Sequence, residues 1–293
     1  MLRLGIIGIS EGNGHPYSWS AIFNGYNQEY AQDCPFPVIP DYLSKQQFPE
    51  DQIQHARITC VWTQDIEQSR AIAQFSYIDY VCESLEEMTD KVDAVLLARD
   101  DAETHFEYAL PFLKAGIPIF IDKPFAYTTQ EAQSMLENCQ HEWQLFTCSA
   151  LRFAKEFQLA AELKVQIQYV EASIGKRWNK YGIHILEPSV QLLPHRGKLL
   201  SVSNTGDEFS DDVIVKWENA SARFRCTGDQ PSPLEINYEG SKQSGKLSFS
   251  DTYNCFKASL LCFVDNVVIG RSLPIARTET LEIITILEKG LKG

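Results

Sequence analysis

The sequence lacks long apolar runs and closely spaced cysteine pairs. No apolar stretch approaches the ~20 residues that cross a bilayer as a helix. The run after Arg3 is short and glycines follow it at once, so no signal peptide is predicted. None of the eight cysteines forms a C-x-x-C pair, which favours small buried hydrophobic residues in a reducing compartment over a disulfide framework or a metal site. The expected location is the cytoplasm.

Basic residues are also scarce. The chain has 26 Lys and Arg against 39 Asp and Glu, for a formal net charge of -13. This balance disfavours nucleic acid and anionic membranes as partners, but a small anionic ligand stays compatible because helix N-termini bind anions locally. With 293 residues, 44% hydrophobic and 22% charged, the chain is typical of a soluble globular protein with one large domain or two ordinary ones.

Short apolar strands alternate with helical patterns in the first half of the chain. This alternation favours a doubly wound parallel sheet of the Rossmann type. Helices are expected at 18–25, 65–74, 102–115 and 129–139. The expected strands are 2–9, 57–63, 78–81, 92–98, 117–121 and 143–149.

The second half shows mostly period-two alternation with turn-rich connections. Such a pattern predicts a mainly antiparallel open sheet with one solvated face. The expected strands are 166–174, 198–203, 212–217, 222–226, 234–238 and 246–249. Helices over 259–268 and 277–291 are expected to cover the other face, although the last helix can instead pack back on the first domain. We therefore predict a Rossmann domain over 1–122 and an α+β domain over 123–293.

Residues 27–55 form an irregular insertion between the first helix and the second strand. The segment contains four aromatic residues and four prolines. Disordered segments are poor in aromatic residues, so an ordered flap packed on the first domain is favoured over a disordered loop.

A glycine-rich turn follows the first strand. It departs from G-x-G-x-x-G, because serine stands where the second glycine is usual. Backbone N–H groups of such a turn, at a helix N-terminus, can hold a pyrophosphate, and a serine adds a hydroxyl donor. Glycines in a turn can also serve packing alone. The candidate cofactor-binding residues of the turn are Gly8, Ser10, Gly12, Asn13 and Gly14.

Further cofactor candidates follow the second and fourth strands. Thr63 takes the place where an acidic residue usually binds the ribose, and Asp65 comes two residues later, where it can instead cap the next helix. Ala98 and Arg99 end the fourth strand, and Arg99 either contacts the cofactor or pairs with Asp101. No arginine is placed for a 2′-phosphate, so NAD and NADP both remain open.

Asp122-Lys123-Pro124 follows the fifth strand. Ligands of open α/β sheets bind beyond the carboxyl ends of the strands, so Lys123 lies where chemistry is expected. The alternative is a surface lysine after a strand, as most lysines are. Its position at this edge, followed by proline, favours function, with Asp122 and Lys123 as cofactor contacts.

Four segments together resemble the Gfo/Idh/MocA family, which includes glucose–fructose oxidoreductase and inositol dehydrogenase. The segments are LRLGIIGI at 2–9, the stretch over 92–128 that ends in Asp122-Lys123-Pro124, SALRF at 149–153, and KYGIHILEPSVQLL at 180–193. The resemblance implies a nicotinamide-dependent oxidoreductase acting on a sugar, cyclic polyol or sugar derivative. It also implies a Rossmann domain and an α+β domain whose open sheet often builds homodimers or homotetramers.

The resemblance also assigns catalytic candidates. Lys123 can hydrogen-bond the substrate hydroxyl, where an ammonium stabilises developing negative charge. His184 falls on the family's histidine and is the candidate general base, although it can also be a satisfied core histidine. Lys180 stands where the family has aspartate. It can relay protons, bind an acidic substrate group or end the helix in solvent.

Four other residues have both a functional and a structural interpretation. Arg152 and Trp178 are substrate candidates, or they brace the domain junction and anchor the core. His15 can contact a phosphate or belong only to the turn, and His105 is expected to be structural. No spacing indicates a metal site. The alternative function is a catalytically weak or inactive nucleotide-binding sensor or scaffold of the same fold.

Overall fold

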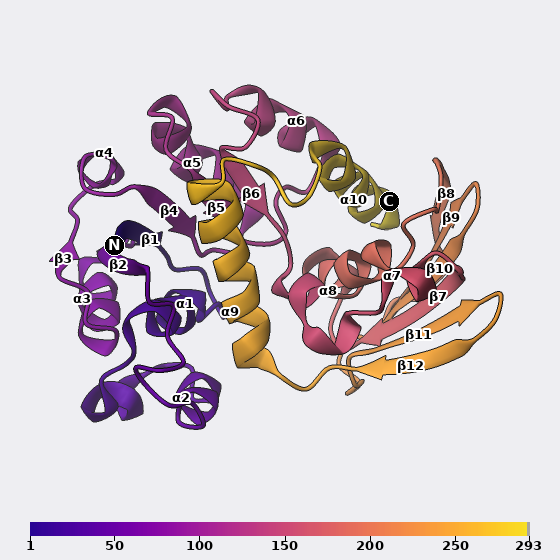
Figure 1. Ribbon diagram of the computed structural model, residues 1–293, viewed down its shortest axis with the longest axis horizontal. Helices are drawn as coiled ribbons and strands as arrows, with labels where there is room; N and C mark the ends of the chain where they lie inside the picture. Colours follow the sequence, from indigo (N-terminus) through magenta and orange to yellow (C-terminus); the bar gives the residue numbers. More distant parts are fainter. Residues whose placement is uncertain (292–293) are drawn as a thin grey trace. The chain divides into compact units, whose positions relative to one another are not determined.

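The computed structural model describes residues 1–291, which form two compact units (Figure 1). The first unit comprises Met1–Phe125, Gln133–Thr147 and Phe256–Ala276. The second comprises Ala126–Ala132, Cys148–Cys255 and the chain from Arg277 onward. The chain therefore passes between the units several times, whereas the sequence suggested one passage after Asp122. Each unit is described by itself below.

The first unit is built on a parallel sheet with strand order β3-β2-β1-β4-β5-β6. This order and the parallel pairing are those of the Rossmann fold, so the predicted fold class is confirmed. The six strands are β1 (Leu2–Ile7), β2 (Ala56–Trp62), β3 (Tyr80–Val81), β4 (Ala94–Leu97), β5 (Ile119–Ile121) and β6 (Leu145–Thr147).

The central strands of this sheet are apolar because both of their faces are covered. Every residue of β4 and β5 is buried. The connecting helices are α1 (His15–Asn24), α3 (Ile66–Phe75), α4 (Leu85–Thr89), α5 (His105–Lys114) and α6 (Thr129–Glu137), with a 3-10 turn η2 (Ala102–Thr104) before α5. Ser84 caps α4 by accepting a hydrogen bond from the Glu87 N–H.

The insertion between α1 and β2 is ordered, as its aromatic content indicated. It contains a 3-10 helix η1 (Gln28–Asp33) and a short helix α2 (Val38–Leu43). Ile39, Leu43 and Ile53 are buried, and the Ile53 N–H donates to the Ile22 carbonyl oxygen at 3.0 Å. The flap thus packs on the first unit through α1.

The second unit contains the predicted antiparallel sheet, in the order β12-β11-β7-β10-β9-β8. Only β7 and β10 are parallel among its paired strands. The strands are β7 (Ile167–Ile174), β8 (Leu199–Asn204), β9 (Asp211–Trp217), β10 (Ser221–Cys226), β11 (Glu235–Gly240) and β12 (Ser244–Ser248). Alternating burial along β9 and β10 leaves one face in solvent.

Two long helices belong to the second unit. α8 (Trp178–Gln191) packs on β7 and β10, and α10 (Arg277–Gly290) packs on α8 and β8. Shorter elements are η3 (Ala150–Phe153), η4 (Lys155–Phe157) and α7 (Ala161–Lys164). The prediction that the last helix covers this sheet is therefore confirmed.

The helix expected over 259–268 was assigned to the wrong sheet. Here α9 (Thr252–Cys262) continues into a π-helical turn, η5 (Phe263–Ile269), and the segment from Phe256 onward belongs to the first unit. The Phe263 ring lies 5.7 Å from Phe120 and 6.2 Å from Phe146, measured between centroids. Aromatic partners on β5 and β6 thus determine where this segment packs, and local periodicity does not reveal them.

Candidate functional site

The turn between β1 and α1 leaves backbone donors available. Glu11 and Gly12 are exposed, and within residues 1–291 no hydrogen bond is found to their N–H groups. Gly12 has φ of 78°, and no heavy atom lies within 4 Å of the place where its Cβ would be. Gly8 has a packing role, because a Cβ there would clash with Pro16 Cγ. Packing therefore requires glycine at position 8, whereas the space beside Gly12 is free for a ligand to approach the backbone.

Two carboxylates from neighbouring strands hold this turn. Ser10 Oγ donates to Asp100 Oδ1 at 2.6 Å, and the Asp100 N–H donates back to Ser10 Oγ at 3.1 Å. Asp122 Oδ2 lies 3.1 Å from Asn13 Nδ2 and 2.5 Å from His15 Nδ1. The ends of β1, β4 and β5 are thereby joined at one edge of the sheet.

Lys123 lies at this edge. Its Nζ is 3.7 Å from Asp100 Oδ2, and its side chain is only 8% exposed. Its N–H donates to Asp122 Oδ1 at 2.8 Å. Burial alone would raise the pKa of Asp122, but His15 and Lys123 favour the carboxylate and lower that pKa to about 2. The ionised, buried carboxylate of Asp122 thus holds the Lys123 backbone beside the turn, and Asp100 pairs with the Lys123 ammonium.

Arg99 supports the turn through hydrogen bonds. Its guanidinium forms a bidentate pair with Asp101, and Nη1 donates to the Ile9 carbonyl oxygen and to Gln64 Oε1 at 2.9 and 2.8 Å. Of the two interpretations of Arg99, the structure shows the pair with Asp101. The pair is buried rather than at the surface, since Arg99 is 5% exposed. Ala98 is buried, and its N–H donates to the Ile7 carbonyl oxygen.

The Thr63 hydroxyl at the end of β2 is already bonded within the first unit. The Thr63 hydroxyl bonds the Asp65 carbonyl oxygen at 2.5 Å and Ser69 Oγ at 2.8 Å. Asp65 caps α3 through the Glu67 N–H, which confirms the structural interpretation of this residue. The sequence placed Thr63 correctly at the strand end but could not show that its hydroxyl turns inward.

His105 links the ends of β4 and β5. The ring is fully buried, with Nδ1 3.1 Å from the Phe125 carbonyl oxygen and Nε2 3.0 Å from that of Arg99. Burial lowers the pKa of His105, so the neutral form is favoured. The expected structural role is confirmed, because the ring ties the segment after Lys123 to the segment that carries Arg99 and Asp100.

α8 carries the candidate residues of the second unit. His184 Nδ1 lies 2.9 Å from Ser149 Oγ, and the Tyr181 ring packs edge-on against the imidazole. Lys180 lies one helical turn before His184, and both side chains are partly exposed. These two residues share a helix face in the second unit, whereas Lys123 belongs to the first.

Arg152 and Trp178 are engaged within the second unit. Arg152 forms ion pairs with Glu187, at 3.0 Å, and with Glu279. Trp178 is 1% exposed, and its indole N–H donates to the Leu287 carbonyl oxygen at 3.0 Å. The geometry of Trp178 matches its interpretation as a core anchor. Arg152 braces the interior of the second unit, whereas the sequence suggested a brace of the domain junction.

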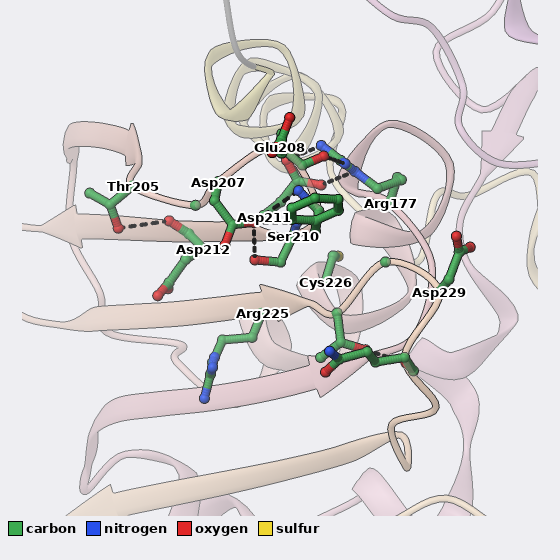
Figure 2. Close-up of a pocket in the computed structure, with 15 residues that line it drawn as sticks. Arg177, Thr205, Asp207, Glu208, Ser210, Asp211, Asp212, Arg225, Cys226 and Asp229 are labelled. Carbon is green, nitrogen blue, oxygen red and sulfur yellow. Dashed lines mark hydrogen bonds and ion pairs between the residues drawn. The ribbon is translucent and has the colours of Figure 1, made fainter.

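A cavity of the second unit was not indicated by the sequence. It has a volume of about 760 Å³ and lies between the loops over 205–210 and 227–230 (Figure 2). Asp211, which lines it, accepts hydrogen bonds from Arg177 Nε at 2.9 Å and from the Trp178 N–H at 3.0 Å. Asp207 accepts from the Phe209 and Ser210 N–H groups. These acids therefore fix the loops that enclose the cavity.

Comparison with known proteins finds a family model that matches part of the chain. Residues 38–148 match the model of the Gfo/Idh/MocA oxidoreductases, described as an NAD-binding Rossmann fold. The resemblance seen in the sequence is thereby confirmed, and the family's cofactor is a nicotinamide dinucleotide. The search of curated protein sequences found no match.

Solved structures share the fold along nearly the whole chain. Scyllo-inositol dehydrogenase from Lactobacillus casei has a TM-score of 0.75 at 13% identity, covering 99% of this chain and 94% of its own. UDP-N-acetylglucosamine 3-dehydrogenase from Acidithiobacillus ferrooxidans gives 0.74 at 16%, covering 98% and 95%. GenD2 from gentamicin A biosynthesis, solved with NAD, gives 0.70 at 14%, covering 98% and 92%. At these identities the likeness establishes the fold.

The residues present fit a dinucleotide at the β1–α1 turn. The unpaired N–H groups of Glu11 and Gly12 and the open space beside Gly12 allow a phosphate to approach the backbone. α1 adds the partial positive charge of a helix N-terminus. None of the helices in the described part of the chain has the length and apolar character needed to cross a membrane.

Proposed function

We propose that the protein is an NAD(P)-dependent oxidoreductase that transfers a hydride between nicotinamide and a sugar, cyclic polyol or sugar derivative. One observation carries this proposal. The ammonium of Lys123 and the open glycine turn are held at the same sheet edge by Asp100 and Asp122. The family-model match of residues 38–148 supports the cofactor, and the activities named for the structural neighbours suggest the substrate class.

The turn residues Gly8, Ser10, Gly12, Asn13 and Gly14 would hold the dinucleotide. Gly12 provides the approach to the phosphates, while Ser10 and Asn13 keep the turn in place through their carboxylate partners. A bound dinucleotide supplies the hydride acceptor or donor. NAD and NADP are both retained in the proposal, because the Thr63 hydroxyl is used internally and Arg99 is paired with Asp101.

Lys123 would donate a hydrogen bond to the reacting oxygen of the substrate. Negative charge develops on that oxygen as the C–H bond breaks, and a fixed ammonium stabilises it. Asp100 keeps the ammonium near the turn, and Asp122 fixes the Lys123 backbone. Ala98 and Arg99 would support the cofactor from the end of β4.

His184 and Lys180 are the candidate substrate residues of the second unit. Ser149 orients the His184 ring, and an imidazole is a group that can take part in proton transfer. Lys180 would bind an acidic or electron-rich group of the substrate. Arg152 and Trp178 support the fold of the second unit, and the proposal does not need them as direct substrate contacts. The cytoplasm remains the proposed location, on the cysteine pattern of the sequence. By its family resemblance, the protein would form a homodimer or homotetramer.

One observation favours a second function. Lys180 replaces an acid on α8, so the chain lacks one residue of the family's usual acid–base set. A protein with that substitution could bind the dinucleotide and act as a sensor or scaffold without turnover. Both functions share the first unit and differ only in chemistry.

Two measurements separate these functions. NADH and NADPH are first titrated against the protein by fluorescence, and a panel of sugars, cyclic polyols and nucleotide-linked sugars is then screened for absorbance change at 340 nm. The oxidoreductase predicts binding of at least one dinucleotide and turnover on part of the panel. Binding without turnover would support the sensor, and absence of binding would refute both.

A further inference from the structure

The cavity between the loops over 205–210 and 227–230 belongs to the second unit alone. The first loop joins β8 to β9, and the second follows β10. The cavity volume of about 760 Å³ lies within the ~300–1,000 Å³ that is typical of sites for small molecules. The glycine turn and Lys123 are part of the first unit, so this cavity is separate from the proposed dinucleotide site.

Hydrogen bonds fix the two loops where they meet. Lys176 and Gly228 exchange two backbone hydrogen bonds, of 2.6 and 2.9 Å. A Cβ on Gly228 would clash with the Phe209 carbonyl oxygen, so glycine allows the loops to approach each other. Asp207 Oδ1 accepts hydrogen bonds from the Phe209 and Ser210 N–H groups, at 2.9 and 2.8 Å. The walls of the cavity are therefore preformed, which reduces the entropy lost when a ligand binds.

Phe209 presents an exposed ring at this polar cavity. The residue is 73% exposed, more than any other Phe, Tyr or Trp in the described chain, although its N–H is held by Asp207. A sugar or cyclic polyol has an apolar C–H face, which packs on an aromatic ring, and hydroxyl groups, which hydrogen-bond to polar groups nearby. A fixed ring beside a polar cavity therefore fits a carbohydrate.

The lining of the cavity has an excess of negative charge. Arg177 is paired with Asp211, and Figure 2 shows Arg225 pointing away from Asp207. Acidic residues outnumber basic ones in the lining, with Asp207, Glu208, Asp211, Asp212 and Asp229 against Arg177 and Arg225.

Two of these acids are available to a ligand. Glu208 and Asp229 are exposed, and within residues 1–291 no hydrogen bond or ion pair is found to their carboxylates. A carboxylate accepts hydrogen bonds from hydroxyl or ammonium groups, whereas it repels a ligand carboxylate or phosphate. The charge of the lining therefore selects against acidic ligands.

We propose that this cavity binds a sugar or cyclic polyol that carries no negative charge. The Phe209 ring packs on the C–H face of the ligand, and Glu208 and Asp229 accept hydrogen bonds from its hydroxyl groups. This inference goes beyond the proposed function, because the site lies in the second unit and requires neither a dinucleotide nor hydride transfer.

Isothermal titration calorimetry without dinucleotide tests the ligand class. The probes are glucose, myo-inositol, glucosamine and glucuronate at neutral pH and low ionic strength. Glucose and glucuronate form a matched pair that differs by one carboxylate. We expect at least one of the first three probes to bind, and glucuronate to bind ~10-fold more weakly than glucose or not at all. Glucuronate binding as tightly as glucose, or no binding of any probe, would overturn the proposal.

Hydrogen–deuterium exchange locates the bound probe. The uncharged probe with the lowest Kd should protect peptides that cover 205–210 and 227–230. Protection confined to α8 around His184, or to the first unit, would place the sugar at the proposed substrate residues and overturn this inference without affecting the proposed function. Conversely, if the sugar protects these loops but neither NADH nor NADPH binds the protein, the proposed function fails and this inference stands.

Phe209→Ala tests the role of the ring. The variant should raise the Kd for the same uncharged probe by ~10-fold. Leu200→Ala is the matched control, because Leu200 is 64% exposed on β8 and lies outside the cavity lining. Its Kd should equal that of the wild type. An unchanged Kd for Phe209→Ala, with a changed oligomeric state in sedimentation velocity, would assign the ring to a contact between copies and overturn the proposal.

The double variant Glu208→Gln, Asp229→Asn tests the role of the charge. It keeps the shape of both side chains and removes two negative charges. The Kd for glucuronate should approach that for glucose, because the repulsion of its carboxylate is weakened. The same Kd ratio in variant and wild type would mean that the two acids do not face the ligand, and would overturn the proposal.

Discussion

The two units use buried charge in opposite ways. In the first unit, Lys123, Asp100 and Asp122 follow the ends of strands and His15 begins α1, beside a turn whose Glu11 and Gly12 N–H groups have no hydrogen-bond partner within residues 1–291. In the second unit, a larger group of charged residues forms ion pairs within the group. Its members are Arg152, Arg196, Glu187, Glu279 and Glu282. A cluster of charged residues can bind a ligand only where some neighbouring hydrogen-bonding groups are not already paired within the protein.

Arg152→Ala should break the second cluster and give the largest effect on stability. The variant leaves Glu187 and Glu279 without their shared partner, and Glu187 is almost completely buried. Removing one member of a buried ion pair costs about 3–5 kcal/mol, which urea unfolding would measure. Arg223→Ala is the control. Its pair with Asp212 is about 40% exposed on the arginine side, so a loss below about 1 kcal/mol is expected.

The substrate interpretation of Arg152 makes a different prediction. A residue that mainly contacts substrate would raise KM while leaving the urea midpoint within error. That pattern would contradict the view that the charged residues of this group in the second unit pair only with one another, while those of the first unit face a ligand.

Lys123→Ala should act on turnover more than on folding. Loss of one donor to the developing alkoxide predicts a fall in kcat of about a hundredfold or more. Lys91→Ala is the matched control, since Lys91 is a partly exposed lysine that precedes β4 at the opposite edge of the same sheet. Circular dichroism should show a folded protein in both cases. A Lys123→Ala enzyme with wild-type turnover would remove the ammonium from the mechanism.

The contribution of His105 to the free energy of unfolding should depend on pH. Its pKa is lowered by burial, so the unfolded chain binds a proton that the folded chain does not. Stability should therefore fall as pH drops below about 6.5, by at most about 1.4 kcal/mol per pH unit from this residue. The difference in unfolding free energy between wild type and His105→Gln, measured from pH 7 to 5, isolates this contribution. A difference that does not change with pH would refute it.

Most of the fold was predictable because its strands are short and strongly patterned. The apolar runs over 92–98 and 117–121 became the buried strands β4 and β5, and period-two alternation located all six strands of the second sheet. Lys123 was found from its place after a strand. These signals are local, so one sequence is sufficient to interpret them.

The remainder depends on contacts between distant residues. The sequence does not show that His15 meets Asp122, 107 positions away, or that Ser10 meets Asp100, 90 positions away. The inward turn of the Thr63 hydroxyl and the pairing of Arg99 are equally hidden. The segment after Phe256 was misassigned for the same reason, since its aromatic partners lie on β5 and β6.

Hydrogen–deuterium exchange with and without NADH is the most direct test of a dinucleotide site at this sheet edge. Peptides that cover 8–15 and 98–101, and the segment that contains Asp122 and Lys123, should become protected when NADH binds. The loops over 205–210 and 227–230 in the second unit serve as the internal comparison. Protection confined to those loops, with the β1–α1 turn unchanged at saturating NADH, would contradict the proposed site.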